Sequence, residues 1–250
     1  MDVFGFFTFL LLAATVILIS YGFDRLYAQI LPLRTLYHAI RMPGIVLHEL
    51  AHIIGCLITG AKIRNVVLFS RDGGSVTYAE PEIPLLGSVI ISTAPLLLLP
   101  LFLVLLTWIF QSVINVPLGI VMPPPDGDLT FPVIITTVTN LFYNNLTVRF
   151  NGWFILYLYV CITIILSLGP SAQDFTNAAI GIALIAATCL LVIMSGFAPV
   201  INLLDRILAM LGYIFTVGII FEVIVAVVSL PFLLIYGIKM GIKRFRQLRR

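Results

Sequence analysis

Charged residues are scarce in this sequence of 250 residues. Asp, Glu, Lys and Arg make up 10% of the chain, whereas 61% of the residues are hydrophobic and the mean hydropathy is +1.15. A water-soluble domain of this size needs far more charge on its surface, so that class is excluded. The composition predicts an all-α protein that crosses a membrane several times.

Cysteine is also rare. The three cysteines, Cys56, Cys161 and Cys189, lie inside apolar stretches. An odd number of thiols in such stretches is not the pattern of a disulfide framework. We therefore expect these cysteines to be packing residues.

Apolar stretches suited to membrane crossing occur six times, since a transmembrane helix needs about 20 mostly apolar residues. These stretches are residues 3–21, 42–60, 85–110, 153–168, 174–194 and 210–238. The first has no basic residue before it and no small-residue cleavage site after it, so we expect a transmembrane helix rather than a signal peptide. The sequence thus predicts one membrane-embedded domain over residues 1–250, with about six transmembrane helices.

Two of the connections have a distinct composition. In residues 62–80, β-branched and aromatic residues flank Asp72, Gly73 and Gly74, which predicts a small β-hairpin after the second helix. Residues 111–151 contain the Pro-rich run "MPPPDGD", which predicts an irregular loop on the membrane surface.

The basic residues predict an orientation in the membrane. The tail at 239–250 reads "KMGIKRFRQLRR", and the positive-inside rule places such a tail in the cytoplasm. With six spans, the N-terminus and the hairpin would also be cytoplasmic. Arg25, Arg34 and Arg41, between the first two spans, oppose this orientation unless a short helix lies along the membrane surface there. We expect a multi-pass protein of the cell membrane, in contact with lipid and with no nucleic-acid partner.

The second apolar stretch contains the pattern HExxH, as "HELAH". His48 and His52 stand at i and i+4, so both imidazoles lie on one face of a helix and could hold one metal ion. In zinc hydrolases the metal lowers the pKa of water toward about 7, and a neighbouring carboxylate accepts the proton as water attacks a carbonyl group. The sequence predicts one Zn²⁺ ion on His48 and His52, with Glu49 as the catalytic base.

A zinc ion held by two histidines needs at least one further protein ligand. The acidic residues near the later apolar stretches are Asp174, Asp205 and Glu222. Asp174 follows the Gly-Pro interruption in "SLGPSAQDF", on the predicted membrane side of the two histidines, and is favoured. Asp205 has Arg206 as an ion-pair neighbour on the other side and stays as the alternative, and Glu222 has no predicted role.

These features together carry a resemblance to a known family. "HELAH" in a membrane helix, a β-hairpin directly after it and an aspartate at a later Pro-containing helix junction resemble the site-2 protease family of intramembrane zinc metalloproteases. The resemblance covers about residues 42–194. The chain has "LGPSAQDF" where the family typically has an Asn-Pro stretch ending in Leu-Asp-Gly, as in a divergent branch. The resemblance implies an endopeptidase that hydrolyses peptide bonds in or near transmembrane segments of other membrane proteins.

The predicted hairpin suits such a substrate. A helical substrate must unwind before its peptide bonds can be attacked, and an exposed strand edge can hold the unwound segment by main-chain pairing. The candidate substrate-binding residues are Val66, Val67, Leu68, Val76 and Thr77.

Non-proteolytic functions are the alternative. A zinc-binding sensor or a scaffold derived from a protease would keep the histidines, but it could discard Glu49, which is present. A metal transporter would need a second cluster of His, Asp or Glu along its path, and the sequence marks none.

Overall fold

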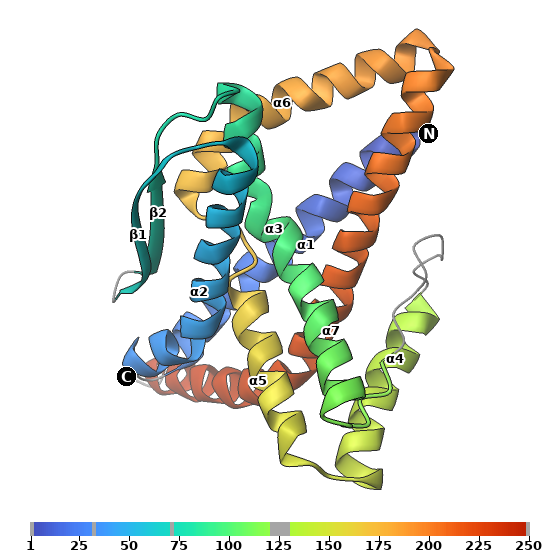
Figure 1. Cartoon of the computed structure of the whole chain (residues 1–250). Coiled ribbons are helices and arrows are strands. Elements are labelled where there is room, and N and C mark those ends of the chain that lie inside the picture. The colour runs from blue at the N-terminus through green and yellow to red at the C-terminus, as the bar shows by residue number, and fades with distance from the viewer. Residues whose placement is uncertain (1–2, 32–33, 71–72, 121–130, 249–250) are drawn as a thin grey trace.

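Helices make up most of the fold, and a two-stranded hairpin lies at one side of them in the computed structural model (Figure 1). The structure describes residues 3–31, 34–70, 73–120 and 131–248. The elements are α1 (Val3–Ile30), α2 (Arg34–Thr59), β1 (Ile63–Ser70), β2 (Gly73–Tyr78), α3 (Pro84–Trp108), the π-helical turn η1 (Ile109–Val113), α4 (Phe131–Tyr143), the π-helical turn η2 (Asn144–Val148), α5 (Gly152–Leu166), α6 (Ala172–Ser195) and α7 (Ala198–Leu248).

The helix ends follow local sequence signals. Pro84 opens α3 at a position where a missing N–H costs nothing. The Asn151 side chain accepts a hydrogen bond from the Trp153 N–H and so caps α5. Gly196, with a φ of 69°, ends α6 in the left-handed conformation that glycine adopts without strain.

The predicted hairpin is confirmed. Strands β1 and β2 pair antiparallel, with Val66 opposite Val76, and irregularities in the register occur near both ends. Ile63, Val76 and Tyr78 pack against a buried cluster of α2 and α3, so the hairpin folds back along α2 instead of extending away from it.

The prediction of an irregular loop over residues 111–151 is wrong for residues 131–148. These residues form α4 and η2, and Leu141 of α4 is fully buried in the main core. The apolar run "FPVIITTV" gives a helix one face that can be buried, and this burial stabilises the helix although a proline-rich segment precedes it. The prolines of "MPPPDGD" lie outside the described residues.

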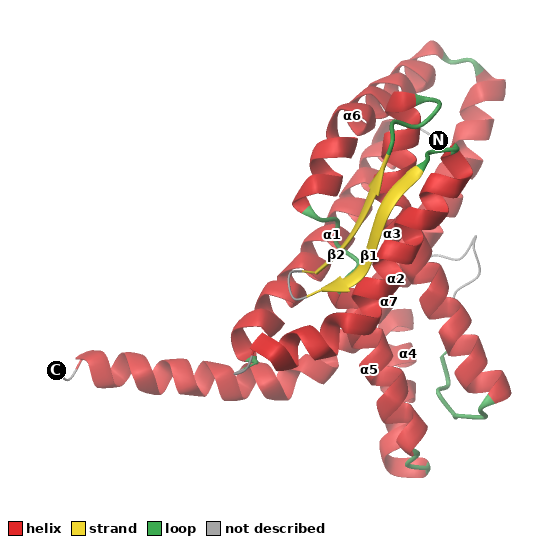
Figure 2. Cartoon of the chain, turned by 60° about the vertical axis from the view of Figure 1, so that its left-hand side comes forward, coloured by secondary structure: helices red, strands yellow, loops and turns green. Residues whose placement is uncertain are grey.

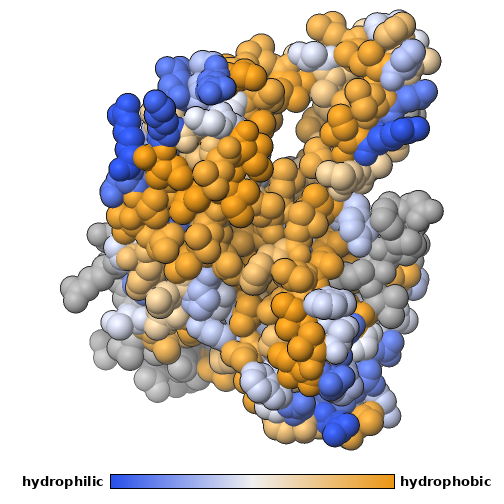
Figure 3. Space-filling view, in the orientation of Figure 1, coloured by the Kyte–Doolittle hydropathy of each residue, from blue (hydrophilic) through white to orange (hydrophobic). Residues whose placement is uncertain are grey.

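Four helical segments are long and apolar enough to cross a membrane: Val3–Ile30, Thr35–Thr59, Pro84–Val113 and Ala198–Ile238. Two further apolar helices, Gly152–Leu166 and Ala179–Ser195, are shorter. The space-filling view agrees with a membrane protein, because apolar side chains cover the middle of this face while hydrophilic ones gather toward its upper and lower ends (Figure 3).

The two shorter helices run in series along α3. Near the C-terminal end of α3, the Thr107 hydroxyl lies 2.9 Å from the Tyr157 hydroxyl of α5. Near its N-terminal end, Gly181 of α6 packs directly against Val89. Helices α5 and α6 thus contact opposite ends of α3 and are separated by a break between Leu166 and Ala172, and neither is among the four long apolar helices.

Helices α1 and α7 run parallel to each other. The rings of Phe9 and Phe215 lie 5.7 Å apart, and the Tyr27 hydroxyl lies 2.9 Å from the Ser229 hydroxyl. Beyond Pro231, the last part of α7 leaves the bundle (Figure 2). The start of α1 and the end of α7 therefore lie at opposite ends of the bundle, whereas the sequence predicted both termini on one side.

Candidate metal centre

The HExxH residues lie in the middle of α2, where that helix packs closely on its neighbours. His48, Glu49 and His52 are between 6% and 9% exposed. Close packing is possible because α2 has Gly44 at its contact with α5, where a Cβ atom would overlap the Thr163 carbonyl group. The two histidines are therefore held among α2, α3 and α5.

Each histidine ring is oriented by one main-chain carbonyl group. His48 Nδ1 lies 2.6 Å from the Ser167 carbonyl oxygen, and His52 Nδ1 lies 2.8 Å from the Ile91 carbonyl oxygen. A carbonyl oxygen only accepts hydrogen bonds, so both Nδ1 atoms carry the proton and donate it. Both Nε2 atoms are consequently free of protons when the rings are neutral.

The two carbonyl groups are available because neither has a helical partner. Pro95 in α3 has no N–H, so the Ile91 carbonyl, four residues earlier, lacks its usual hydrogen bond. Ser167 is the C-cap of α5, and its carbonyl lies past the last helical turn. The Gly-Pro break after Ser167 is evident in the sequence, whereas the role of Pro95 depends on the position of His52 against α3 and was not predicted.

Acceptor atoms of three side chains, His48, His52 and Asp174, converge on one point. The two Nε2 atoms lie 3.1 Å apart, Asp174 Oδ1 lies 3.3 Å from His52 Nε2, and Asp174 Oδ2 lies 3.6 Å from His48 Nε2. Atoms with only lone pairs repel one another at these distances unless a cation lies between them.

The donor set fits zinc. In a tetrahedral site with bonds of about 2.0–2.1 Å, the ligand atoms lie about 3.3 Å from one another. The two Nε2 atoms, at 3.1 Å, are close to this spacing, and each lies 3.3 or 3.6 Å from a different oxygen of Asp174. With one atom taken from each residue, the three atoms lie within 4.8 Å of one another. Two imidazoles and a carboxylate are also ligands that zinc prefers. Among the described residues, His48, His52 and Asp174 form a group that could hold a metal ion.

Asp174 is positioned by the start of α6. It occupies the third helical position after Ser171, whose hydroxyl accepts a hydrogen bond from the Asp174 N–H at 3.1 Å. The Asp174 carboxylate in turn accepts hydrogen bonds from the Ser171 N–H at 2.9 Å and the Ser171 hydroxyl at 2.6 Å. This capping box fixes the carboxylate toward the histidines, and the pattern Ser-x-x-Asp is its sequence signature.

Glu49 lines a cavity of about 650 Å³ together with His48. The tip of the hairpin reaches the same cavity, because Gly73 and Gly74 line it as well. At Gly74, a Cβ atom would overlap Glu49 Cγ and would lie 2.7 Å from Oε1, so the hairpin backbone rests on the Glu49 side chain. The two glycines were predicted as part of a turn, and their place in the site was not predicted.

The other predicted candidates lie elsewhere. Asp205 belongs to α7 instead of the predicted loop, because α7 begins at Ala198, and it is not part of the group that could hold a metal. Glu222, also in α7, is 1% exposed and is likewise outside that group.

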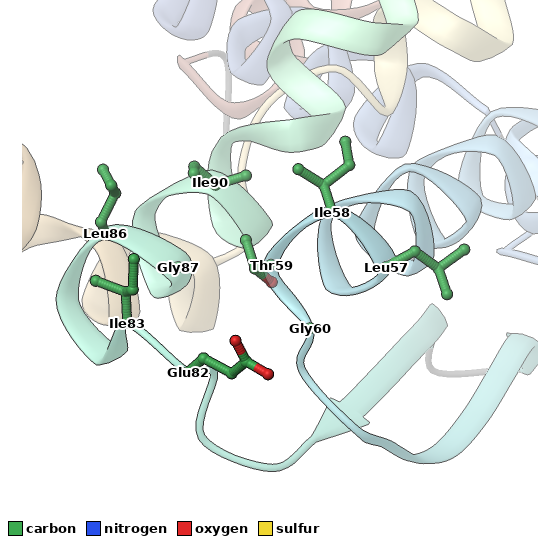
Figure 4. Close-up of a pocket in the computed structure, with 9 residues that line it drawn as sticks. All are labelled: Leu57, Ile58, Thr59, Gly60, Glu82, Ile83, Leu86, Gly87 and Ile90. Atoms are coloured by element: carbon green, nitrogen blue, oxygen red, sulfur yellow. The ribbon is translucent and has the colours of Figure 1, made fainter.

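A second pocket lies where α2 ends and α3 begins (Figure 4). Its volume is about 360 Å³, and it is lined by Leu57, Ile58, Thr59, Gly60, Glu82, Ile83, Leu86, Gly87 and Ile90. Glu82 is the one ionisable residue in this lining, so the pocket offers no set of metal ligands.

Ser20 of α1 holds the turn between α5 and α6. Its hydroxyl donates to the Ile165 carbonyl oxygen at 2.6 Å and accepts from the Gly169 N–H at 3.0 Å, and the side chain is fully buried. The turn carries both the Ser167 carbonyl that orients His48 and the start of the helix that bears Asp174. Ser20 therefore positions two of the three metal ligands indirectly.

We expect Ser20→Ala to weaken zinc binding about 10- to 100-fold, because residues that orient metal ligands typically contribute that much affinity. Competition with a chelating dye on the purified protein measures this. Ser229→Ala is the matched control, since the Ser229 hydroxyl is also fully buried, donates to Val225 O at 2.6 Å and lies 2.9 Å from the Tyr27 hydroxyl, far from the metal ligands in the sequence. Equal zinc affinity in Ser20→Ala and wild type would contradict the positioning role.

No family model, curated protein or solved structure matches this chain. The chemistry of the site is therefore inferred from its own geometry. Three converging acceptor atoms, a buried glutamate beside them and a cavity that reaches both are the features that any function must use.

Proposed function

We propose that this protein is an intramembrane zinc endopeptidase that hydrolyses peptide bonds in or near transmembrane segments of membrane proteins. The observation that carries the proposal is the convergence of His48, His52 and Asp174 beside Glu49 at the wall of a cavity. The resemblance of "HELAH", the following hairpin and the aspartate at a helix junction to the site-2 protease family supports the same function.

The residues of the site have separate tasks in this reaction. His48, His52 and Asp174 would hold the zinc ion, which would act as a Lewis acid on a carbonyl group and lower the pKa of water. Glu49 would accept a proton at its carboxylate and return it to the leaving amine. Its burial and its contact with Gly74 restrict the carboxylate to few orientations, which would hold the base in place for proton transfer.

The irregular backbone around the site is consistent with an intramembrane protease. The break between α5 and α6 interrupts helical hydrogen bonding, and among the described residues the hairpin has no third strand beside it. Irregular backbone of this kind is tolerated at membrane depth only where it lines a wet cavity or is buried in protein. Residues of both segments line the cavity that contains Glu49. A hydrolase needs water at this place.

The hairpin is the proposed holder of the unwound substrate. Val66 and Leu68 of β1 are 38% and 37% exposed, whereas Val76 of β2 packs on the cluster that contains Cys56 and Ile91. Val76 therefore has a packing role in the hairpin. A substrate would instead pair with the main chain along a strand edge that faces away from this cluster. Because Gly74 touches Glu49, a strand added beside the hairpin tip would pass close to the proposed base.

We expect Gly74→Ala to reduce peptide cleavage strongly while zinc content is retained. The new methyl group would overlap Glu49 Cγ, so either the hairpin tip or the carboxylate must move. Gly152→Ala is the control, because a Cβ atom at Gly152 has no neighbour within 4 Å. Cleavage by Gly74→Ala at the wild-type rate would show that the contact between the tip and Glu49 is dispensable.

The fold supports a revised orientation in the membrane. The end of α1, the start of α2, the start of α5 and the end of α7 lie toward one end of the bundle, whereas the end of α2, the base of the hairpin and the start of α7 lie toward the other (Figure 1). The segments at the first end carry Arg25, Arg34, Arg41, Arg149 and the basic tail, and those at the second end carry Lys62, Arg64 and Arg206. The arginines between α1 and α2 no longer oppose the tail. We therefore propose that the tail and the α1–α2 connection are cytoplasmic, and that the N-terminus and the base of the hairpin are on the outer side of the cell membrane.

Cysteine labelling tests this orientation. We expect Ala28→Cys, at the exposed end of α1, to react with an impermeant maleimide only from the cytoplasmic side. Glu80→Cys, at the exposed base of the hairpin, should react only from outside. Labelling of both positions from the same side would contradict the arrangement in which α2 crosses between them.

The function itself is tested with purified protein in liposomes that contain single-span membrane proteins. We expect cleavage products whose new ends map to the transmembrane segments by mass spectrometry, with cleavage lost to a zinc chelator and restored by zinc. A protein that binds one zinc ion and cleaves none of a broad set of such substrates would support the alternative, a non-proteolytic zinc sensor or scaffold.

A further inference from the structure

The cavity that reaches Glu49 also reaches a charged cluster, formed where α1 and α2 approach each other. Four residues of this charged cluster line the cavity: Tyr21, Asp24, Arg25 and Arg41. Arg41 stands seven residues before His48 on α2, so the cluster lies two helical turns, about 10 Å along the helix axis, from the metal centre.

One arginine of the cluster has a structural partner. Arg41 Nε lies 3.0 Å from Asp24 Oδ1, and the Tyr37 hydroxyl donates to the same oxygen at 2.5 Å. An Arg41 terminal amino group also donates to the Tyr37 hydroxyl at 3.2 Å. The charge of Asp24 is therefore balanced, and this triad joins α1 to α2.

The other arginine, Arg25, is held in place by a tyrosine, which does not neutralise the charge of its guanidinium group. Arg25 Nε donates to the Tyr21 hydroxyl at 2.9 Å, and the guanidinium carbon lies 5.0 Å from the centre of the Tyr21 ring. Within the part of the chain that the structure describes, Arg25 has no carboxylate partner, and its two terminal amino groups have no acceptor. A planar guanidinium group held in this way presents two parallel N–H donors, the geometry that binds a carboxylate.

We infer that Arg25 is a specificity-determining residue that binds a carboxylate of the substrate about three residues from the scissile bond. An extended segment rises about 3.3 Å per residue, so three residues span the distance between the cluster and the metal centre. The substrate would carry an acidic side chain at this position. The inference rests on the proposed function and names the class of substrate for the same site.

Binding of zinc-directed inhibitors tests the inference without a known substrate. Three peptide hydroxamates that differ only in Glu, Gln or Lys, three residues from the hydroxamate group, are titrated into the zinc-loaded protein in nanodiscs of phosphatidylcholine. We expect the Glu peptide to bind about tenfold or more tightly than the Lys peptide, since a charge-assisted pair contributes at least that much. Arg25→Gln should remove this preference and Arg25→Glu should reverse it.

Arg149→Glu is the matched control, because Arg149 is exposed near the same end of the bundle and does not line the cavity. Zinc content of each variant reports whether the site is intact. Equal affinity for all three peptides in the wild type would overturn the inference while leaving the metal centre in place, whereas failure of every hydroxamate to bind would count against the proposed function itself. A Glu preference that disappears in nanodiscs containing phosphatidylglycerol would also overturn it, because Arg25 would then bind anionic lipid headgroups in preference to a substrate carboxylate.

Discussion

Purified His48→Ala protein will contain no stoichiometric zinc, whereas the wild type will contain one ion per chain. Removal of one imidazole leaves two ligands, one fewer than the three that zinc sites in proteins ordinarily require. The loss of affinity should therefore exceed the roughly 10- to 100-fold that follows from loss of a residue that only orients a ligand. Metal analysis by mass spectrometry after dialysis measures the content.

The chain offers matched controls for each ligand. His38→Ala changes the remaining histidine, which lies near the start of α2 and outside the group that could hold a metal, and it should keep its zinc. Asp174→Asn should lose zinc while Asp205→Asn keeps it. The opposite result for the two aspartates would transfer the third ligand position to Asp205, and zinc retained by His48→Ala would refute the metal centre as described.

The Glu49→Gln variant should keep its fold and its zinc but cleave peptide bonds about 10²- to 10⁴-fold more slowly, the usual contribution of a general base. Glutamine has nearly the same shape, so it preserves the contact with Gly74 and removes only the capacity to accept a proton. The rate is measured on a substrate that the wild type cleaves in liposomes.

Glu82→Gln provides the comparison for that experiment, since Glu82 is an exposed carboxylate in the second pocket between α2 and α3 (Figure 4). It should cleave like the wild type. If Glu49→Gln also cleaves at the wild-type rate, Glu49 is not the base, and the reaction must use another proton acceptor in the cavity.

The local parts of this fold follow from the sequence. The hairpin at Gly73, the HExxH face of α2 and the helix start that carries Asp174 each depend on signals within a few residues, and each was predicted. Apolar stretches also mark where helices lie. They do not show whether two short helices cross the membrane separately or in series, because that depends on packing against α3 at Thr107 and Val89.

Long-range contacts account for the other differences between the predicted and the observed fold. The sequence predicted a hairpin that could hold a substrate, but it did not show how the hairpin packs. Its apolar residues contact α2 and α3, which brings Gly74 to Glu49. Ser20 and Gly169 are separated by 149 positions in the chain, so no local pattern could connect them. The proposed orientation differs from the predicted one for the same reason, because the sequence alone did not show that α1 and α7 run parallel.

The hydrogen bonds from the two histidines to the Ile91 and Ser167 carbonyl groups do not depend on the side chains at positions 91 and 167. Because a main-chain oxygen is present whatever the side chain is, no substitution at either position deletes the atom that orients the ring. The information that keeps these carbonyls free lies instead at Pro95, which leaves Ile91 without a helical partner, and at the end of α5. An alanine scan of Ile91 and Ser167 would therefore not reveal that these positions orient the histidine rings. Substitution of Pro95, in contrast, would add an N–H group to α3 that competes with His52 for the Ile91 carbonyl.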